Sequence, residues 1–298
     1  MTVGIVIVTY KCRDLAIACI ESVEAHLPDL VAAIVVVDNA SDDGTAAAIR
    51  ARWPAIRVVE NRRNTGFAAA VNRGIEAIKD VSVVCLLNPD ATLLDAGIPS
   101  AASYLEAHPR VGVLGGKILN ANGTVQASAR SFPSHRNALF NRHSLTTKLL
   151  PRNRWSRAYL LSDWKHDEIR TVDWVSGALM LIHRRAIDAV GLFDAGYFFS
   201  IEDVDFCKRV RDAGLSVEYF PAAAVRHRIG GSSRKAVYRA MAAHHRGMWR
   251  YYAKHMRGSG FVDGVTFAGI WARFSLHAVS YAARSARNRV LRYGERSV

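Results

Sequence analysis

The sequence predicts an α/β fold, in which a mostly parallel central sheet is flanked by helices and followed by basic C-terminal helices. Short apolar runs alternate with amphipathic stretches through the first part of the chain, which is typical of βαβ units. The main apolar runs end in polar residues, at the edge where open α/β sheets bind their ligands. The C-terminal part combines helical periodicity with a large excess of arginine.

Four apolar runs and three amphipathic stretches define the first part of the predicted sheet. Most of the runs are rich in valine and isoleucine without polar alternation, as expected of strands that are covered on both faces. The predicted elements are strands over 3–10, 32–38, 56–60 and 81–88, and helices over 14–26, 42–52 and 66–78.

The second part of the chain is less regular. An Asn-Gly pair within 120–125 predicts a hairpin turn because it tolerates positive φ. Many Arg, Asn, Ser, His and Trp residues over 128–170 predict a long surface segment. The other predicted elements are a helix over 95–108, strands over 110–119, 172–182 and 216–220, a helix over 184–191, a helix closed by Gly214 and a helical region over 234–293.

Composition excludes several classes of protein. The four cysteines are scattered without metal-ligand spacing, so we expect reduced core residues in a cytosolic protein. The chain begins a strand at once, without the basic start and cleavage site of a signal peptide. No apolar stretch approaches the ~20 residues needed to cross a bilayer. We therefore expect a cytoplasmic protein that is not an integral membrane protein.

The formal net charge of +14 is concentrated at the C-terminal end. From residue 234 onward, thirteen basic residues stand against two acidic ones, which leaves +11 there and an almost balanced remainder. Such charge suggests nucleic acid, an anionic membrane or a phosphorylated substrate as partner. Because no helix-turn-helix, RNP or zinc pattern is present and the charge lies outside the α/β part, no nucleic-acid partner is expected.

Two polar residues, Asp38 and Asn39, follow the second predicted strand. Their carboxylate and amide could contact a pyrimidine edge or a ribose. The alternative is an ordinary turn in which Ser41 or Asp42 caps the next helix. From these residues alone, both interpretations stay open.

Gly66 and three alanines begin the third predicted helix. Small side chains let a helix backbone approach a ligand closely, and Arg62 or Arg63 is available to a phosphate. Tight packing of the helix on the sheet explains the same composition equally well. The dinucleotide-binding glycine pattern and the P-loop are both missing from the sequence, so a nucleotide would be bound by another design.

Asn88, Pro89 and Asp90 end the fourth predicted strand. Asp90, held by the proline, is a candidate ligand of Mg²⁺ or Mn²⁺, with a diphosphate and water completing the coordination. Asn88 can hydrogen-bond a ribose or phosphate without adding charge. The alternative is a simple Pro-Asp turn.

Three carboxylates, those of Glu202, Asp203 and Asp205, lie in one turn of a predicted helix. Ser200 and Asp203 have the spacing of a capping box, so a structural role is a strong alternative. A cap needs only one carboxylate, however, and the aromatic residues 197–199 look exposed. An aspartate at a helix start stays ionised at neutral pH and can accept a proton from an attacking hydroxyl.

His227 lies between two arginines and precedes a glycine pair. Lone histidines are more often structural, but imidazole, guanidinium and loop amides together suit a metal-bound diphosphate. A functional role for His227 is therefore favoured.

Taken in order, these stretches resemble the inverting GT-A glycosyltransferases of family 2, and most of all their bacterial rhamnosyltransferase branch. The resemblance covers roughly residues 3–235 and is specific as an ordered set. Its motifs are VIVTYK at 6–11, VVVDNASDDGT at 35–45, NTGFAAAVNRGI at 64–75, LLNPDA at 86–91, VSGALMLIHRRAIDAVGLFD at 175–194, FFSIEDVDFCKRVRDAG at 198–214 and HRIGGSS at 227–233.

The resemblance implies a domain organisation. A GT-A catalytic domain would cover 1–233, with a nucleotide-sugar-binding half over 1–95 and an acceptor-binding half over 96–233. A basic helical region over 234–298 would follow it.

The resemblance also implies roles for individual residues. Asp203 would be the general base, with Glu202 beside it. The nucleotide sugar would be bound by Thr9, Tyr10, Asp38, Asn39, Arg63, Asn64, Gly66, Asn88 and Asp90, the acceptor by Ser176, Gly177 and Ala178, and the metal by Asp90 and His227.

The implied activity is the transfer of a sugar with inversion by single displacement, with Mg²⁺ or Mn²⁺ as cofactor. The first choice is L-rhamnose, from deoxythymidine-diphosphate-rhamnose (dTDP-rhamnose) to a polyprenyl-diphosphate-linked N-acetylglucosamine. One departure affects the expected metal dependence, because the family's Asp-x-Asp is Asn88-Pro89-Asp90 here. That variant resembles those using dTDP-rhamnose or related donors.

Other activities stay open. Another donor, such as uridine-diphosphate-galactofuranose, is the alternative within the enzyme class. A non-catalytic sugar-binding, nucleic-acid-binding or membrane-binding protein is the alternative outside it. Retention of Asp90 together with Glu202 and Asp203 argues against a non-catalytic protein.

The basic C-terminal region alternates aromatic residues and leucines with arginines. Such helices can lie at the headgroup level of an anionic membrane, where each cation contributes ~1 kcal/mol. The hypothesis is therefore peripheral association with the inner face of the cell membrane, beside a lipid-linked acceptor. A helical cap on the catalytic domain and a homo-oligomer interface are the alternatives.

Overall fold

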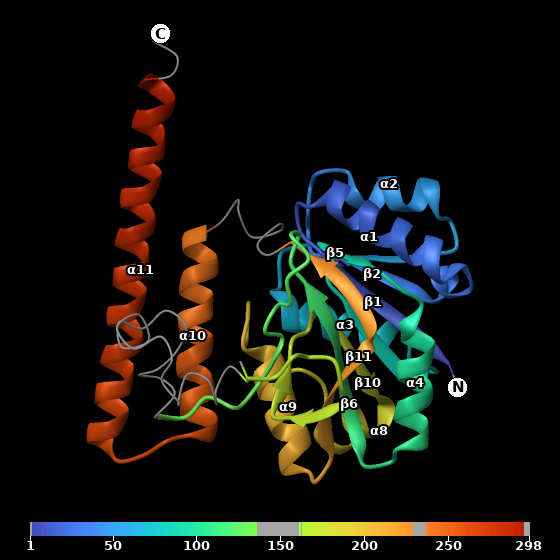
Figure 1. Cartoon of the computed structure of the whole chain (residues 1–298). Coiled ribbons are helices and arrows are strands. Elements are labelled where there is room, and N and C mark those ends of the chain that lie inside the picture. Colours follow the sequence, from blue (N-terminus) through green and yellow to red (C-terminus); the bar gives the residue numbers. More distant parts are fainter. Residues whose placement is uncertain (1, 136–160, 162, 229–236, 295–298) are drawn as a thin grey trace.

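The computed structural model describes residues 2–135, 161, 163–228 and 237–294 of the chain. Most of the surface segment predicted over 128–170, and the glycine pair after His227, lie outside these residues. Figure 1 shows a central sheet covered by helices and, beside it, two long C-terminal helices. The prediction of an α/β fold with C-terminal helices is confirmed.

Within the described residues, the central sheet contains nine strands in the order β3-β2-β1-β4-β10-β6-β11-β5, and β8 pairs with β11. A separate small sheet is formed by β7 and β9. The strands are β1 (Val3–Thr9), β2 (Ile34–Asp38), β3 (Arg57–Glu60), β4 (Val83–Leu87), β5 (Ala91–Leu93), β6 (Val111–Leu119), β7 (Ala129–Arg130), β8 (Arg170–Val172), β9 (Trp174–Val175), β10 (Leu179–His183) and β11 (Ser216–His227).

Strand direction divides the sheet into two halves. β3, β2, β1 and β4 are parallel to one another, as predicted, because a helical crossover joins each strand to the next. In the other half, β10 is antiparallel to both β4 and β6, and β5 and β8 are antiparallel to β11. The carboxyl ends of β1, β2 and β4 therefore meet at one edge of the sheet.

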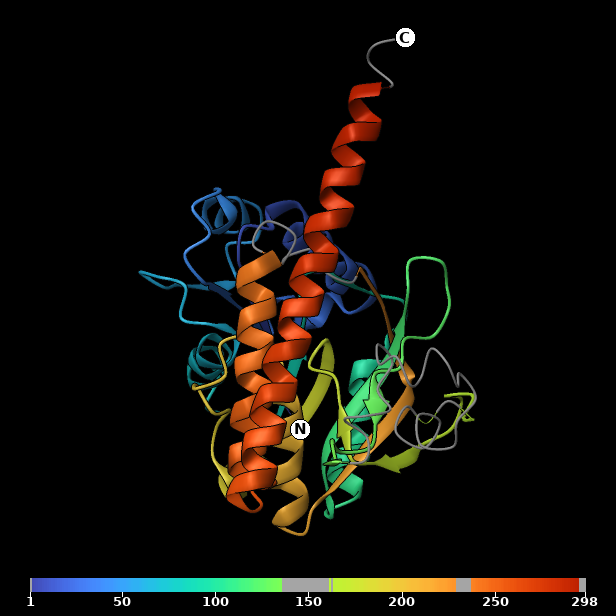
Figure 2. The same ribbon diagram turned by 90° about the vertical axis from the view of Figure 1, so that its left-hand side faces the viewer.

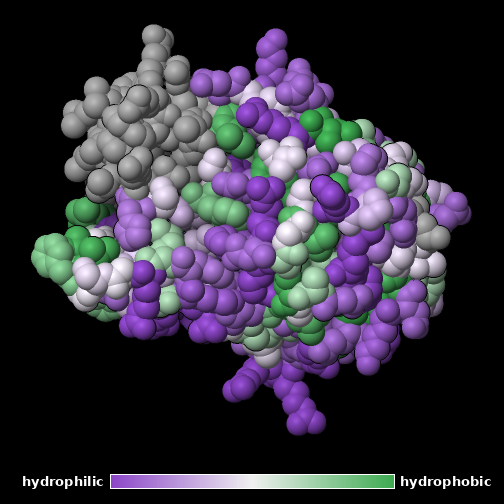
Figure 3. Space-filling model, turned by 90° about the horizontal axis from the view of Figure 1, so that it is seen from below, coloured by the Kyte–Doolittle hydropathy of each residue, from purple (hydrophilic) through white to green (hydrophobic). Residues whose placement is uncertain are grey.

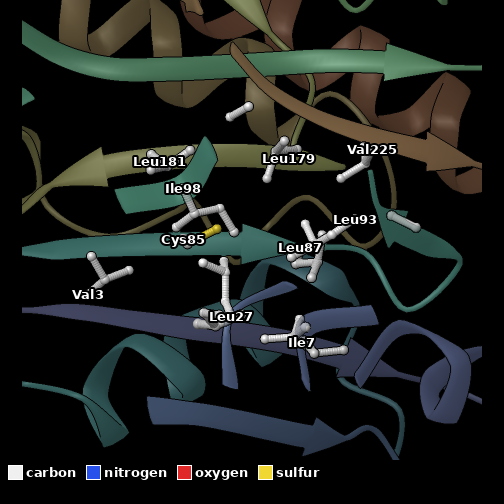
Figure 4. Packing of buried hydrophobic residues seen from close by; sticks show 14 of the residues in the cluster. Val3, Ile7, Leu27, Cys85, Leu87, Leu93, Ile98, Leu179, Leu181 and Val225 are labelled. Carbon is white, nitrogen blue, oxygen red and sulfur yellow. The ribbon is translucent and has the colours of Figure 1, made fainter. Parts of the chain in front are cut away.

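Alternate residues of the buried strands face two different helical layers. Ile5 and Ile7 of β1 pack in the cluster that includes α1 and α4, whereas Val6 and Val8 pack in the cluster that includes α3 and α9. Figure 4 shows part of the first cluster, in which side chains from several strands lie close together. Burial of each such side chain contributes about 1.5–3 kcal/mol relative to exposure. Burial on both faces explains the continuous apolar runs of the sequence.

The helices of the first half are α1 (Arg13–His26), α2 (Thr45–Arg52) and α3 (Phe67–Ala77), and a short 3₁₀ helix covers Pro28–Ala33. They match the predicted helices to within a few residues.

The predicted N-caps of α2 are wrong. Gly44, with φ of +78°, precedes the helix, and Asp43 accepts a hydrogen bond from the Thr45 amide at 3.1 Å. Ser41 cannot cap the helix because its hydroxyl is hydrogen-bonded to Asp38 at the end of β2.

The helices between α3 and the C-terminal pair are α4 (Gly97–Ala107), α8 (Arg184–Val190) and α9 (Glu202–Asp212). The predicted hairpin turn is confirmed, since the Asn120 amide donates to Thr124 O at 2.8 Å and Gly123 has φ of +81°. The four cysteines are buried and free, as predicted.

The start of α9 differs from the predicted capping box. The N-cap is Ile201, with φ of +74° and no side-chain cap. Ser200 instead lies with its hydroxyl 3.1 Å from His244 Nδ1, so it is held from outside the helix. Gly214, with φ of +83°, follows the end of the helix as predicted.

The strand predicted over 172–182 is divided into β9 and β10. Ser176, Gly177 and Ala178 interrupt it because their backbone groups bond three different neighbours rather than one strand. The Ser176 amide donates to Ser128 O at 2.8 Å, and Ala178 O accepts from the Asn88 amide at 3.1 Å. The resulting loop lies at the end of β4.

β11 is longer than predicted, because it continues past 216–220 to His227. Its pairing with β6 steps from Phe220 opposite Gly116 to Ala224 opposite Lys117, which leaves a bulge of residues 221–223. Beyond the bulge, β11 also pairs with β5.

The C-terminal region forms α10 (Val237–His255) and α11 (Gly260–Gly294), with a break at 256–259 inside the single helical region that the sequence predicts. The two helices lie side by side, and α11 extends well beyond the rest of the molecule (Figure 2). In the described part of the chain, no helix has both the length and the apolar composition needed to cross a bilayer.

Candidate functional site

Thr9 and Asp38 lie side by side at the carboxyl ends of β1 and β2, because the parallel register pairs them. The Thr9 hydroxyl donates to Asp38 Oδ1 at 2.9 Å, and the Ser41 amide donates to Oδ2 at 3.3 Å. All three residues are buried. Strand register therefore fixes the Asp38 carboxylate at the edge of the sheet.

Asn39 organises the loop between β3 and α3. Its Oδ1 accepts from Asn61 Nδ2 at 2.8 Å and from the Thr65 amide at 3.0 Å, and its Nδ2 donates to Asn64 Oδ1 at 3.0 Å and to Gly66 O at 3.2 Å. Both ends of this buried amide are thus used within the protein. Asn39 therefore holds this loop, and its contact with a nucleoside stays a prediction.

Gly66 is small because another backbone lies against it. Its φ is +88°, and a Cβ at this position would lie 2.7 Å from Phe198 O. The Phe67 amide donates to the same carbonyl at 2.8 Å. Gly66 therefore allows tight packing, but against the segment that leads into α9 and not against the sheet, and its approach to a ligand stays a prediction.

Asp90 and His227 meet because β5 and β11 pair with Ala91 opposite His227. His227 Nε2 lies 3.1 Å from Asp90 Oδ1, and Gln126 Oε1 lies 3.3 Å from His227 Nδ1. The Asp90 side chain is only 4% exposed. The sequence favoured a functional His227 but gave no sign that Gln126 would orient it.

The donor set at this corner fits a divalent cation that is shared with a ligand. One carboxylate and one imidazole nitrogen are suitable ligands of Mn²⁺ and, for the oxygen, of Mg²⁺. Within the described residues, no group of three or more His, Cys, Asp or Glu side chains is gathered for a metal. Asp90 and His227 would therefore supply part of the coordination and leave the rest to diphosphate and water.

Glu202 and Asp203 begin α9 on the other side of the Ser176–Ala178 loop. Asp203 Oδ2 accepts from the Gly177 amide at 3.3 Å, and Oδ1 accepts from the Val204 amide at 2.9 Å. Burial raises the pKa of Asp203 above its ordinary value, although these amide hydrogen bonds oppose the shift. A carboxylate with a raised pKa is a stronger proton acceptor once ionised.

Glu202 is more deeply placed than Asp203. It is 6% exposed, and Oε2 has no hydrogen-bond partner among the described residues. Burial, together with the neighbouring Asp203, raises the pKa of Glu202 well above its ordinary value. The two carboxyls thus form a pair in which Glu202 holds its proton more readily.

A short path of hydrogen bonds connects the two acidic corners. Asn88, two residues before Asp90, donates its amide to Ala178 O at 3.1 Å. The adjacent Gly177 donates its amide to Asp203 at 3.3 Å. The predicted metal ligand, the predicted acceptor loop and the predicted base therefore lie in one neighbourhood.

Of the three carboxylates, Asp205 lies away from the site, and the expectation that residues 197–199 are exposed holds for Phe198 and Phe199 but is wrong for Tyr197. The Asp205 side chain is fully buried and accepts hydrogen bonds from Arg209, Lys254 and His255, so it faces the C-terminal helices rather than the site. Tyr197 is also buried, at 1% exposure, and its hydroxyl donates to Asp205 at 3.2 Å.

The remaining predicted residues lie at the margin of the site. Tyr10 is half-buried next to Lys11, whose Nζ lies 5.5 Å from the centre of the Tyr10 ring. Arg63 is exposed in the loop held by Asn39. The structure does not bring Tyr10 or Arg63 into the hydrogen-bond networks around Asp38, Asn39 or Asp90 described above.

Arg130 is a residue of the site that sequence reasoning missed. It lies in β7, which pairs with β9 so that Arg130 is opposite Trp174. Its Nε donates to Ala127 O at 2.8 Å, and its positive charge lowers the pKa of Asp203, against the larger effect of burial. No motif marked it, because the segment around it has little periodicity.

The comparisons with known proteins agree with this geometry. The family model described as glycosyl transferase family 2 matches residues 4–163. An N-acetylglucosaminyl-diphospho-decaprenol L-rhamnosyltransferase of Mycobacterium tuberculosis is 32% identical over 235 residues, which cover 76% of each chain. Rhamnosyltransferase WbbL of Escherichia coli K12 is 35% identical over 83 residues, covering 28% of this chain and 31% of WbbL.

Solved structures with similar folds are glycosyltransferases. A mannosyltransferase from Pyrobaculum calidifontis with GDP-Man and Mn²⁺ has a TM-score of 0.57 and 16% identity, covering 97% of this chain and 80% of that one. GalNAc-T7 with UDP, GalNAc and Mn²⁺ has the same TM-score and identity, covering 82% of this chain but only 47% of that one. At such identities, the likeness concerns the fold, and it confirms the predicted GT-A type. By its sequence and its fold, the chain belongs to glycosyl transferase family 2.

Proposed function

We propose that the protein is an inverting glycosyltransferase that transfers L-rhamnose from dTDP-rhamnose to an N-acetylglucosamine carried on a polyprenyl diphosphate. The mycobacterial relative, named for that acceptor and that sugar, supports the choice of substrates. The observation that carries the chemistry is the path from Asp90 through Asn88 and Gly177 to Asp203. This path supports the proposal because it links the corner of Asp90 to that of Asp203 through neighbouring elements.

The proposed reaction is a single displacement. An acceptor hydroxyl oxygen forms a bond to the anomeric carbon, while the bond from that carbon to the diphosphate oxygen breaks. The hydroxyl proton passes to the carboxylate of Asp203. Burial of Asp203 favours this transfer because it raises the affinity of the ionised carboxylate for a proton.

Glu202 and the loop 176–178 support the base in different ways. Glu202, buried and inclined to hold its proton, would limit negative charge beside Asp203. The Gly177 amide fixes one Asp203 oxygen at 3.3 Å and leaves the base oriented toward the loop. Ser176, Gly177 and Ala178 would therefore border the acceptor sugar.

The donor would be held along the carboxyl ends of the parallel strands. Thr9, Asp38 and Asn88 would lie along the nucleoside and ribose, while Asn39 holds the loop that presents Asn64. Tyr10, Arg63 and Gly66 would complete the edge. Asp90 and His227 would hold a divalent cation, Mg²⁺ or Mn²⁺, which when bound would neutralise charge on the diphosphate.

The C-terminal helices would place the protein at the cytoplasmic face of a membrane that contains the lipid-linked acceptor. Phe261, Val265, Leu276 and Val279 are all more than half exposed, and their spacing brings them to one side of α11. In the view from below in Figure 3, some hydrophobic residues are exposed on the side of the molecule where α10 and α11 lie. Together with the C-terminal excess of positive charge, this apolar side suits an anionic lipid surface.

Vesicle sedimentation tests the membrane proposal. The protein should sediment with vesicles containing anionic lipid at low salt and less at high salt, and Leu276→Glu should weaken binding. Failure to sediment at low salt would contradict it. Sedimentation velocity of the free protein measures its oligomeric state and tests the alternative that the apolar side of α11 is a homo-oligomer interface.

A donor panel tests the proposed activity. The protein is incubated with dTDP-rhamnose, uridine-diphosphate-galactofuranose and other nucleotide sugars, with and without Mg²⁺ or Mn²⁺, and a short-chain polyprenyl-diphospho-N-acetylglucosamine. Turnover and thermal stabilisation should be greatest with dTDP-rhamnose. Turnover with another donor would replace the proposed sugar, and turnover with none would contradict the proposed function.

A further inference from the structure

The acidic segment, residues 194–205, carries the candidate base Asp203 and is bound by side chains of α10. At its start, Arg250 Nε and Nη2 donate to the two oxygens of Asp194 at 3.1 and 2.8 Å. Lys254 Nζ lies 3.2 Å from the same carboxylate. Both cations come from α10, beyond the range that the motifs of the family cover.

At the end of the acidic segment, Asp205 binds α10 again. Lys254 Nζ lies 2.8 Å from Asp205 Oδ1, and His255 Nε2 lies 2.7 Å from the same oxygen. Arg209 donates to Oδ2 at 2.9 Å, and Tyr197 donates its hydroxyl to Oδ1 at 3.2 Å. Burial alone would raise the pKa of Asp205, but these hydrogen bonds outweigh it and keep the pKa below its ordinary value. The Asp205 carboxylate is thus ionised and joins α10 to the acidic segment.

Between these two ends, the backbone of the acidic segment lies directly against α10. A Cβ at Gly247 would lie 3.1 Å from Ser200 O, and a Cβ at Gly196 would collide with the guanidinium of Arg250. A side chain at Gly247 would press on the Ser200 carbonyl, and one at Gly196 would displace the Arg250 guanidinium from its place beside Asp194. Glycine at these two positions therefore favours the close contact between α10 and the acidic segment.

The residues just before the carboxylate pair have a conformation that must be held from outside. Ser200 and Ile201 have φ of +67° and +74°, a region that costs free energy for residues other than glycine. α10 restrains this turn through His244 and Gly247, in addition to the hydrogen bond from the Asp205 amide to Ile201 O at 3.0 Å. Release of α10 would let this turn relax and move Glu202 and Asp203.

The other side of the acidic segment is anchored independently of α10. Phe198 O accepts from the Phe67 amide at 2.8 Å, next to the loop that Asn39 holds. Loosening the contact between α10 and the acidic segment should therefore disturb Asp203 more than the proposed nucleotide site at the carboxyl ends of β1, β2 and β4.

We propose that α10 positions the catalytic site, and that Asp205 and Lys254 are positioning residues that hold Asp203 against the Gly177 amide. The kinetic consequence rests on the proposed transferase function. The contact between α10 and the acidic segment does not depend on substrate.

The test compares Lys254→Met with Lys208→Met. Lys208 pairs with Asp212 on the same α9 helix, and this pair is more exposed than the Lys254–Asp205 pair, so it is the matched control. Lys254→Met should lower kcat at least about tenfold and change the KM for donor by less than about threefold. The control should leave both close to wild type. Lys254→Arg should restore part of kcat.

Two further readouts separate positioning from general destabilisation. Amide hydrogen exchange over 201–205 should become faster in Lys254→Met while exchange in β1 and β4 stays unchanged. The acid limb of kcat/KM should move to lower pH, because a loosened Asp203 is better hydrated and loses part of the rise in pKa that burial causes. His255→Gln, a milder change, should show the same pattern with smaller effects.

Unchanged exchange over 201–205 in both Lys254→Met and His255→Gln would overturn the proposal, as would equal losses of kcat in Lys254→Met and the control. The exchange measurement needs no substrate. Wild-type protein without turnover on any donor would therefore count against the proposed function, while the exchange result would still decide the link between α10 and the acidic segment.

Discussion

The Asp90 corner and the Asp203 corner are built in different ways. Asp90 follows β4, and its partner His227 reaches it through the register of β5 and β11. Asp203 depends on contacts between segments that are distant in sequence, namely the Gly177 amide and the α10 helix that holds the segment before it. A corner set by strand pairing is as stable as the sheet, whereas a corner set by packed surfaces can be loosened alone.

Asp203→Asn should have the largest effect, because it removes the proposed proton acceptor without changing the shape of the side chain. Turnover should fall by about 10²–10⁴ while nucleotide affinity stays near wild type. Initial rates and calorimetric titration with dTDP measure the two quantities. Asp212→Asn, at the far end of the same helix, serves as the control. Equal loss of turnover and affinity would make Asp203 a structural residue and remove the contrast between the corners.

Asp90→Ala and His227→Ala should come next. Each should lower kcat/KM by about 100-fold, since loss of an outer-shell partner alone costs about 10–100-fold, and raise the Mn²⁺ concentration needed for half-maximal rate. Gln126→Leu should give a smaller shift in the same direction, because Gln126 only orients the imidazole. An unchanged Mn²⁺ dependence in Asp90→Ala would show that this corner binds no metal.

Asn39→Ala tests how far the proposed nucleotide site depends on one buried side-chain amide. Its loss leaves the Thr65 amide without its acceptor and removes one hydrogen bond each from Asn61 and Asn64, which should cost about 2–3 kcal/mol of unfolding free energy and raise the KM for donor. Urea denaturation gives the stability, with the exposed-turn variant Asn122→Ala as control. A stable Asn39→Ala with raised KM would instead indicate direct contact with the nucleoside.

Glu202→Gln should show the smallest effect, and one that depends on pH. The folded carboxyl has a raised pKa, so wild-type stability falls as pH increases from the ordinary value of glutamic acid through the raised value. Glutamine does not titrate, and the variant should therefore be more stable than wild type at pH 8, by at least about 1 kcal/mol, with the gain vanishing near pH 4. Thermal denaturation across that range measures the difference. A constant difference would mean that Glu202 does not titrate with folding.

The sequence predicts those parts of the site that depend on local pattern. Parallel strands ending in polar residues identify Thr9, Asp38 and Asp90, since strand ends and turn residues can be recognised from single segments. Asp205 could not be separated from Asp203 in this way, because three carboxylates in one turn look alike until their partners are known. Their partners lie about 50 residues onward for Asp205 and 26 residues back for Asp203.

Helix caps and strand breaks could not be predicted from the sequence either. Ser41 was expected to cap a helix, but its hydroxyl is used by Asp38. The break at Ser176–Ala178 inside an apolar run depends on Ser128, Asn88 and Asp203, three neighbours that only the folded chain brings together. Arg130 entered the site without any motif, through the pairing of β7 with β9.

The three-residue bulge in β11 limits how the chain can vary. Side chains alternate between the two sides of a strand, so deleting or inserting one residue between Phe220 and His227 would turn the imidazole away from Asp90. Surface loops elsewhere can change length freely in evolution, but this stretch can exchange residues only one for one. Its length, rather than its composition, should be the invariant feature among active descendants of this chain.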